Sequence, residues 1–180
     1  LDVLDQVTVR RVSITRQDGS GTPDAANPHP EGKVPLLDHD GSLVWESNAI
    51  MLYLTDLFPE GGMGPVVGEP TRGAYLSWLA YYGNVMEPVV HFEMTKIDSP
   101  AFKRTFRSAA EMNARIGGAL RDRPYLLGER YSAADLLICS VFAFMPQIVP
   151  DDSDIRAWID RCISRPSVAW TTEFDAAQAA

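Results

Sequence analysis

The chain has 180 residues with 24 acidic and 16 basic side chains, which gives a net charge of −8 and an isoelectric point near 4.8. A nucleic-acid partner is not expected, because such binding needs clustered Lys and Arg. No apolar run reaches the roughly eighteen residues of a membrane helix, and the three histidines lack metal-ligand spacing, so neither a membrane nor a metal is expected.

Two cysteines, Cys139 and Cys162, lie in apolar helical patterns. They form no Cys-x-x-Cys motif, and we interpret both as buried thiols of a reducing compartment. No basic segment precedes an apolar one, so no signal peptide is predicted. These features favour a cytoplasmic protein.

The first third of the chain predicts strands and a hairpin. Residues 7–14 are rich in β-branched side chains, which favours a strand. Residues 17–32 are rich in Gly, Pro, Asp and Asn and predict a long loop, functional or mobile. Strands over 34–38 and 43–45 are expected to form a hairpin around the turn Asp40-Gly41.

Helical periodicity begins at Glu46 and continues to Pro59. Residues 59–70 contain four Gly and three Pro and form the best linker candidate. Ser132 and Asp135 are spaced as a capping box at the start of a later helix. The other helices are expected over 70–94 with a bend at Pro88, over 99–122 and over 154–164, with a frayed tail after Thr171.

Two short motifs suggest a binding site. In Gly32-Lys33-Val34-Pro35, the proline pushes Val34 into an extended conformation. If the Val34–Pro35 bond is cis, the N–H and C=O of Val34 can face outward as a free strand edge, which pairs with a peptide-like ligand. A simple edge-strand device explains the same residues equally well.

The second motif is Glu46-Ser47 at the start of a helix. Ser47 and the unpaired N–H groups of the first turn can hold a carboxylate, and Glu46 can pair with an ammonium. Together they suit the end of an α-amino acid. Capping of the helix by Ser47 is the simpler explanation on spacing alone, and both interpretations stay open.

These motifs resemble the glutathione S-transferase family in order and spacing. The resemblance rests on Asn27–Leu37, Asp40-Gly41, Glu46–Leu54, Arg123–Gly128, Tyr131–Asp135, Trp158 and Arg165-Pro166-Ser167. It implies an α+β two-domain protein, with a thioredoxin-like N-terminal domain followed by an all-helical C-terminal domain. The implied division is residues 1–60, a linker over 61–70 and residues 71–180. A homodimer is implied as well.

The resemblance also implies roles for single residues. Val34, before a cis Pro35, would pair with the cysteinyl backbone of glutathione, the co-substrate. Glu46 and Ser47 would bind the γ-glutamyl end. Lys33 lies where a polar contact to glutathione is common, although a solvated surface lysine is as good an explanation.

In the family, the junction of the first strand and first helix carries a Tyr, Ser or Cys that stabilises the glutathione thiolate. Leu1–Asp5 would match the end of that helix, so the junction is expected upstream and no catalytic residue is assigned. The electrophile pocket is expected between the domains, at the stripe Tyr82, Met86 and Val89. Such a stripe is otherwise ordinary helical core.

The expected function is therefore conjugation of the glutathione thiolate to a small hydrophobic electrophile, as in detoxification, or a related glutathione-dependent reaction. The alternatives are a non-catalytic module of the same fold that binds glutathione or a partner protein, and a plain dimerisation scaffold that binds no glutathione.

Overall fold

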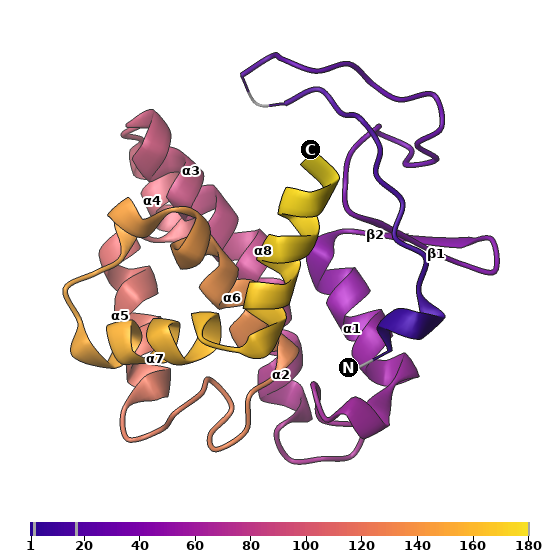
Figure 1. Ribbon diagram of the computed structural model, residues 1–180. Coiled ribbons are helices and arrows are strands. Elements are labelled where there is room, and N and C mark those ends of the chain that lie inside the picture. The colour runs from indigo at the N-terminus through magenta and orange to yellow at the C-terminus, as the bar shows by residue number, and fades with distance from the viewer. Residues whose placement is uncertain (2, 17, 180) are drawn as a thin grey trace.

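A β-hairpin precedes a series of helices in the computed structural model, which describes residues 1, 3–16 and 18–179. The strands are β1 (Leu36–His39) and β2 (Ser42–Trp45). The helices are α1 (Ser47–Leu57), α2 (Arg72–Tyr81), α3 (Glu87–Thr95), α4 (Pro100–Phe106), α5 (Ala109–Leu120), α6 (Ala133–Phe144), α7 (Ser153–Ile163) and α8 (Pro166–Ala179). In Figure 1 the hairpin and α1 lie beside the helical bundle. The segment before the hairpin, residues 7–33, forms an arch above the hairpin.

The predicted hairpin is present and leads directly into α1. Its strands are antiparallel, with Leu36 opposite Trp45 and His39 opposite Ser42. The turn residues Asp40 and Gly41 both have left-handed backbones, with φ of 52° and 82°. This is the conformation that a two-residue hairpin turn requires, so the Asp-Gly signal predicted it correctly.

The strand predicted over residues 7–14 is absent, and that prediction was wrong. Within the described residues the sheet has two strands, β1 and β2, and residues 7–14 pair with neither. The Ser13 carbonyl instead accepts a hydrogen bond from the Asp24 N–H, within the same arch. β-branched composition favours a strand only where a neighbouring strand completes the hydrogen-bond ladder.

The predicted helix over 70–94 is divided. α2 ends at Tyr81, a π-helical turn covers Tyr82–Met86, and α3 follows from Glu87. The expected irregularity near Pro88 therefore takes the form of a wider turn just before that proline.

The helix predicted over 99–122 is also two helices, α4 and α5. Arg107 between them has φ of 73°, and Ser108 caps α5 in a reciprocal box with Glu111. The tail after Thr171 is helical as part of α8, which begins at Pro166. Proline at a first helical position starts a helix as readily as it ends the preceding one.

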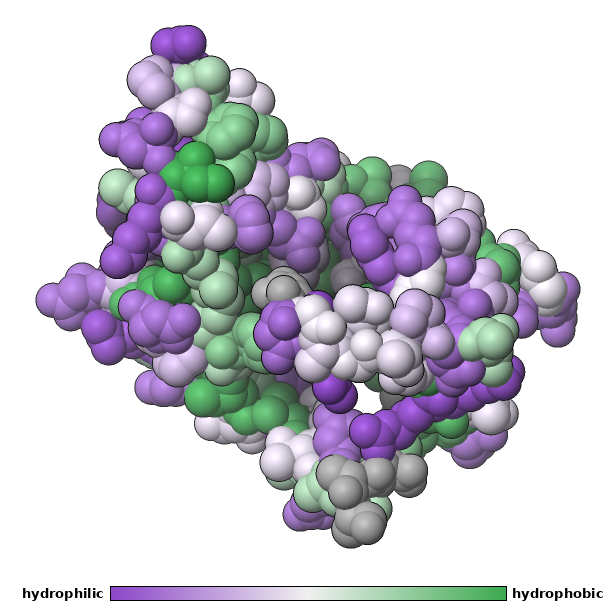
Figure 2. All heavy atoms as spheres, turned by 90° about the horizontal axis from the view of Figure 1, so that it is seen from above, coloured by the Kyte–Doolittle hydropathy of each residue, from purple (hydrophilic) through white to green (hydrophobic). Residues whose placement is uncertain are grey.

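The core lies within the helical part of the chain. Its largest fully buried side chains come from α2, the π turn, α3 and α5 to α7, and include Tyr75, Met86, Met112, Phe142 and Trp158. Seen from above, hydrophobic residues are most frequent on the left-hand side of the view, where they are interspersed with hydrophilic ones (Figure 2). None of the described helices is both long and apolar enough for a membrane span.

Asp135 is a fully buried carboxylate that joins three parts of this core. Its Oδ1 accepts from the Leu126 N–H at 2.8 Å and from the Trp158 indole Nε1 at 3.0 Å. Its Oδ2 accepts from the Ser132 N–H and hydroxyl, both at 2.9 Å, which confirms the predicted return contact of the capping box. Burial raises the pKa of Asp135, and the four hydrogen bonds act in the opposite direction.

Replacing Asp135 with Ala leaves four donors without this acceptor: the N–H groups of Leu126 and Ser132, the Ser132 hydroxyl and the Trp158 indole. We expect Asp135→Ala to lower the free energy of unfolding by about 3–5 kcal/mol, measured by urea denaturation. The exposed Glu173→Ala on α8 is the control and should leave the urea midpoint unchanged. An Asp135→Ala midpoint equal to that of the control would contradict this role.

Candidate functional site

The loop before the hairpin is fastened by side-chain hydrogen bonds. The Asn27 side chain accepts from the His29 N–H and donates to the Lys33 carbonyl, both at 3.0 Å. The buried His29 accepts from the Glu31 N–H through Nδ1 at 3.0 Å, and its ring packs edge-on against Trp45. These contacts fix the backbone that leads into Val34.

Val34 presents an open backbone edge. The Val34–Pro35 peptide bond is cis, and Val34 is 48% exposed. Within the described part of the chain, neither the N–H nor the C=O of Val34 takes part in a hydrogen bond. Lys33 beside it is exposed and ion-paired with Glu31 at 2.8 Å, an interaction that raises the pKa of Lys33. Lys33 is thus a solvated side chain, next to a backbone that can accept a ligand.

The hairpin delivers Glu46 and Ser47 to the start of α1. Glu46 is exposed and has a left-handed backbone, with φ of 69°, which is uncommon for a residue with a side chain. Such conformations often occur at functional sites. Ser47 is the first residue inside α1, and the residue before it, Glu46, makes no side-chain cap hydrogen bond. In the first turn the Asn48 side chain accepts from the Ala49 N–H at 3.0 Å. The capping interpretation of Ser47 therefore receives no support from the structure, and the helix N-terminus faces outward.

A polar cleft of about 220 Å³ opens at this point between α1 and the π turn. It is lined by Glu46, Ser47, Asn48, Tyr82, Gly83, Asn84 and Glu87. Three residues predicted for two different roles, Glu46, Ser47 and Tyr82, therefore lie together. Burial, and next the hydrogen bond with Glu87, raise the pKa of Tyr82.

The other two residues of the predicted electrophile stripe lie elsewhere. Met86 and Val89 are 0% and 2% exposed and belong to the core. No sequence pattern singles out Asn48, Gly83, Asn84 or Glu87 of the cleft. Pro88 was the available signal, because a proline inside a helix displaces the turn before it and changes which side chains face the same way.

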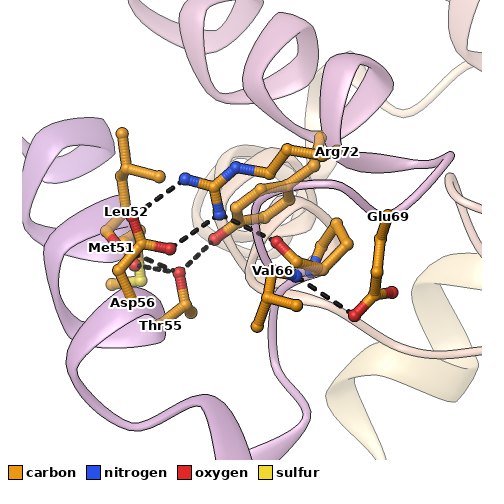
Figure 3. A network of polar contacts seen from close by, with 9 residues as sticks. Met51, Leu52, Thr55, Asp56, Val66, Glu69 and Arg72 are labelled. Atoms are coloured by element: carbon orange, nitrogen blue, oxygen red, sulfur yellow. Dashed lines mark hydrogen bonds and ion pairs between the residues drawn. The ribbon is translucent and has the colours of Figure 1, made fainter.

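The end of α1 away from the cleft is clamped to the start of α2 (Figure 3). The Arg72 guanidinium donates to both Asp56 carboxylate oxygens, at 2.7 and 2.8 Å, and to the Pro65 carbonyl at 2.8 Å. Nearby, the buried hydroxyls of Thr55 and Tyr75 are hydrogen-bonded at 2.8 Å. Because α1 and α2 are antiparallel, this clamp sets how Ser47 faces the π turn.

A second hollow, of about 160 Å³, lies at the linker between residues 62–71 and 127–132 and contains no predicted site residue. The described residues also hold no group of three or more His, Cys, Asp or Glu side chains placed to bind a metal ion.

Comparison with known proteins identifies the family. The family model described as "Glutathione S-transferase, N-terminal domain" matches residues 5–56, and its C-terminal counterpart matches residues 82–166. Glutathione S-transferase GstA of Escherichia coli O157:H7 is 30% identical over 149 residues, which cover 78% of this chain and 72% of GstA. The chain belongs to the glutathione S-transferase family.

Further relatives and solved structures support the same family. Protein LigF of Sphingobium sp. is 40% identical, with 78% of this chain and 73% of LigF covered. Two solved glutathione S-transferases are each 25% identical and cover 82% of this chain and 76% of their own. They are BphK, a bacterial enzyme in a ternary complex, with a TM-score of 0.66, and a sphingomonad enzyme complexed with glutathione, with a TM-score of 0.65. The chain is thus a glutathione S-transferase-like enzyme with a thioredoxin-like part followed by a helical one.

The clamp yields a stability prediction. Arg72→Ala should lower the free energy of unfolding by about 1–2 kcal/mol, because Asp56 and the Pro65 carbonyl lose their shared donor, while the partial exposure of Asp56 limits the loss. Arg72→Lys should restore only part of this, since a lysine lacks the planar fork. Thermal unfolding measures both variants.

A matched control is Lys103→Ala, which removes an exposed ion pair with Asp98 on α4. It should leave the melting temperature unchanged, because exposed pairs contribute little. Equal melting temperatures for Arg72→Ala and Lys103→Ala would show that the clamp does not hold α1 and α2 together.

Proposed function

We propose that this enzyme binds glutathione along the open edge of Val34 and at the N-terminus of α1, and transfers its thiolate to a small hydrophobic electrophile. The observation that carries the proposal is the arrangement of one hairpin. It starts at a free backbone edge beside a cis proline and ends at Glu46 and Ser47, on the rim of a polar cleft.

The chemistry of these two ends matches the two ends of the ligand. A peptide backbone pairs with an open strand edge through its N–H and C=O groups, which suits the cysteinyl unit at Val34. A carboxylate is stabilised by the free N–H groups and the partial positive charge of a helix N-terminus, which suits Ser47. An ammonium is stabilised by the Glu46 carboxylate.

The reaction is proposed at the level of its class. A thiolate that displaces a leaving group serves conjugation and dehalogenation alike. A relative named dichloromethane dehalogenase, from Methylorubrum extorquens, is 28% identical over 81% of this chain and 58% of its own. Of the predicted electrophile stripe, Tyr82 is the residue that reaches the cleft.

Five further expectations belong to this proposal. The enzyme is proposed to be a cytoplasmic homodimer that acts in detoxification without a metal. The division into residues 1–60, a linker over 61–70 and residues 71–180 is proposed as its domain organisation. Titration with glutathione, followed by turnover of an aryl halide with and without glutathione, tests the activity. Binding without turnover of any electrophile would favour the non-catalytic module.

Ser47→Ala removes the hydroxyl proposed to hold the γ-glutamyl carboxylate. We expect glutathione binding to weaken by about 1–3 kcal/mol, measured by isothermal titration calorimetry. The control is Ser77→Ala on α2, whose hydroxyl is bonded to the Gly73 carbonyl. If Ser47→Ala binds glutathione as tightly as wild type, the proposed position of the carboxylate is wrong.

Val34→Ala should change the dissociation constant for glutathione by less than about threefold, because the proposed contacts use the backbone, which alanine retains. The same titration measures it. A loss comparable to that of Ser47→Ala would mean that the Val34 side chain, and not its backbone edge, contacts the ligand.

A further inference from the structure

The Asn27 side chain bridges the two ends of the loop that leads into β1. Its oxygen accepts from the His29 N–H and its nitrogen donates to the Lys33 carbonyl, both at 3.0 Å. These partners determine the orientation of the amide, because the reverse orientation would set two donors against each other at His29 and two acceptors at Lys33. The position therefore suits an amide, which supplies one acceptor and one donor.

The loop between these two contacts is closed on itself. Pro28 and Pro30 each have a fixed φ, which limits the freedom of the backbone. The Gly32 N–H donates to the His29 carbonyl at 2.9 Å, and the left-handed backbone of Gly32, with φ of 65°, turns the chain back toward the asparagine. The buried His29 ring packs against Trp45, so the loop is also anchored to the hairpin.

The contact from Asn27 to the Lys33 carbonyl sets the direction of the Val34 N–H. In the described chain the cis bond is Val34–Pro35, so the Lys33–Val34 peptide is trans. The C=O and the following N–H of a trans peptide lie in one plane and point in opposite directions. Because the Lys33 carbonyl is turned toward Asn27, the Val34 N–H points away from it. Val34 is 48% exposed, and its N–H has no acceptor within the described residues.

The amide of Asn27 is thus the contact that keeps this peptide plane from turning. No other donor in the described part of the chain reaches the Lys33 carbonyl. Without the amide, the plane can rotate about the single bonds on either side, and the Val34 N–H loses its fixed direction. A donor that is already oriented binds its acceptor without the cost of ordering it.

We propose that Asn27 is a positioning residue for glutathione, which acts by aiming the Val34 N–H at the cysteinyl carbonyl of the ligand. Asn27 acts through the Lys33–Val34 peptide and does not itself contact the ligand. This assignment rests on the proposed function and deepens it, because it adds a residue seven positions before the strand edge that the ligand uses.

The test compares two ligands on the wild-type protein and on Asn27→Ser, measured by calorimetry. Serine keeps an acceptor for the His29 N–H, because its hydroxyl forms the same kind of turn, but it lacks the amide that donates to Lys33. The ligands are glutathione and γ-glutamylcysteamine, which keeps the γ-glutamyl group, the amide N–H and the thiol but lacks the cysteinyl carbonyl and the glycine. We expect Asn27→Ser to bind glutathione about 3- to 10-fold more weakly and the analogue as tightly as wild type does.

The matched control is Asp24→Ser, which replaces the other turn-forming side chain of the same loop. Asp24 accepts from the Ala26 N–H at 2.8 Å, and its side chain bonds to no residue of 27–35 in the described chain. This control should leave both affinities unchanged. In turnover, the loss in Asn27→Ser should appear in the KM for glutathione, with kcat unchanged. Equal losses for glutathione and the analogue in Asn27→Ser would overturn the assignment, as would no loss for either.

Hydrogen exchange of the Val34 amide, followed by NMR, tests the same assignment on the wild-type protein. Saturating glutathione should slow this exchange by about tenfold or more, because the N–H gains an acceptor, and the analogue should not slow it. Equal slowing by both ligands would show that the Val34 N–H does not pair with the cysteinyl carbonyl, and the role of Asn27 would fall with it. The proposed function fails separately, if the wild-type protein binds no glutathione.

Discussion

The candidate site depends on how α1 is held against α2. Arg72 bridges Asp56 and the Pro65 carbonyl, and the Thr55 and Tyr75 hydroxyls are hydrogen-bonded in the interior beside them. These contacts join the C-terminal end of α1 to the N-terminal end of α2. Because the two helices run in opposite directions, the clamp also determines where the free N-terminus of α1 meets the turn after α2.

The clamp in turn rests on the packed helical core. Tyr75 and Met86, on either side of the α2 C-terminus, are fully buried, so α2 and the π turn cannot shift without opening the core. In the same core, Asp135 ties the start of α6 to α7 and to the preceding loop. The polar cleft is thus a surface feature with a rigid base, which is the arrangement that binding sites require.

Part of this arrangement could be predicted from the sequence, and the reasons are local. The Asp40-Gly41 turn, the contact from Asp135 back to Ser132, and the start of α1 near Glu46 each depend on neighbouring residues, and each is present. The placement of Glu46 and Ser47 at one helix end followed from the same short-range signals. The resemblance to the family then supplied the ligand.

The rest could not be predicted, because it depends on partners distant in sequence. Residues 7–14 have the composition of a strand, but the described chain offers them no strand to pair with. Met86 and Val89 share a stripe with Tyr82, but whether a stripe faces a cleft or the core is decided by what packs on it. The direction of Glu87 is different, because its cause is local: Pro88 follows it, but the π turn before that proline is not described by a period of 3.6 residues.

The most direct test of the central claim is a crystal structure of the protein with glutathione bound. We expect the cysteinyl backbone of glutathione to pair with Val34, and its γ-glutamyl end to fill the cleft at Glu46 and Ser47. Glutathione bound elsewhere, with the Val34 edge and the N-terminus of α1 both free of ligand, would show that this is not the binding site.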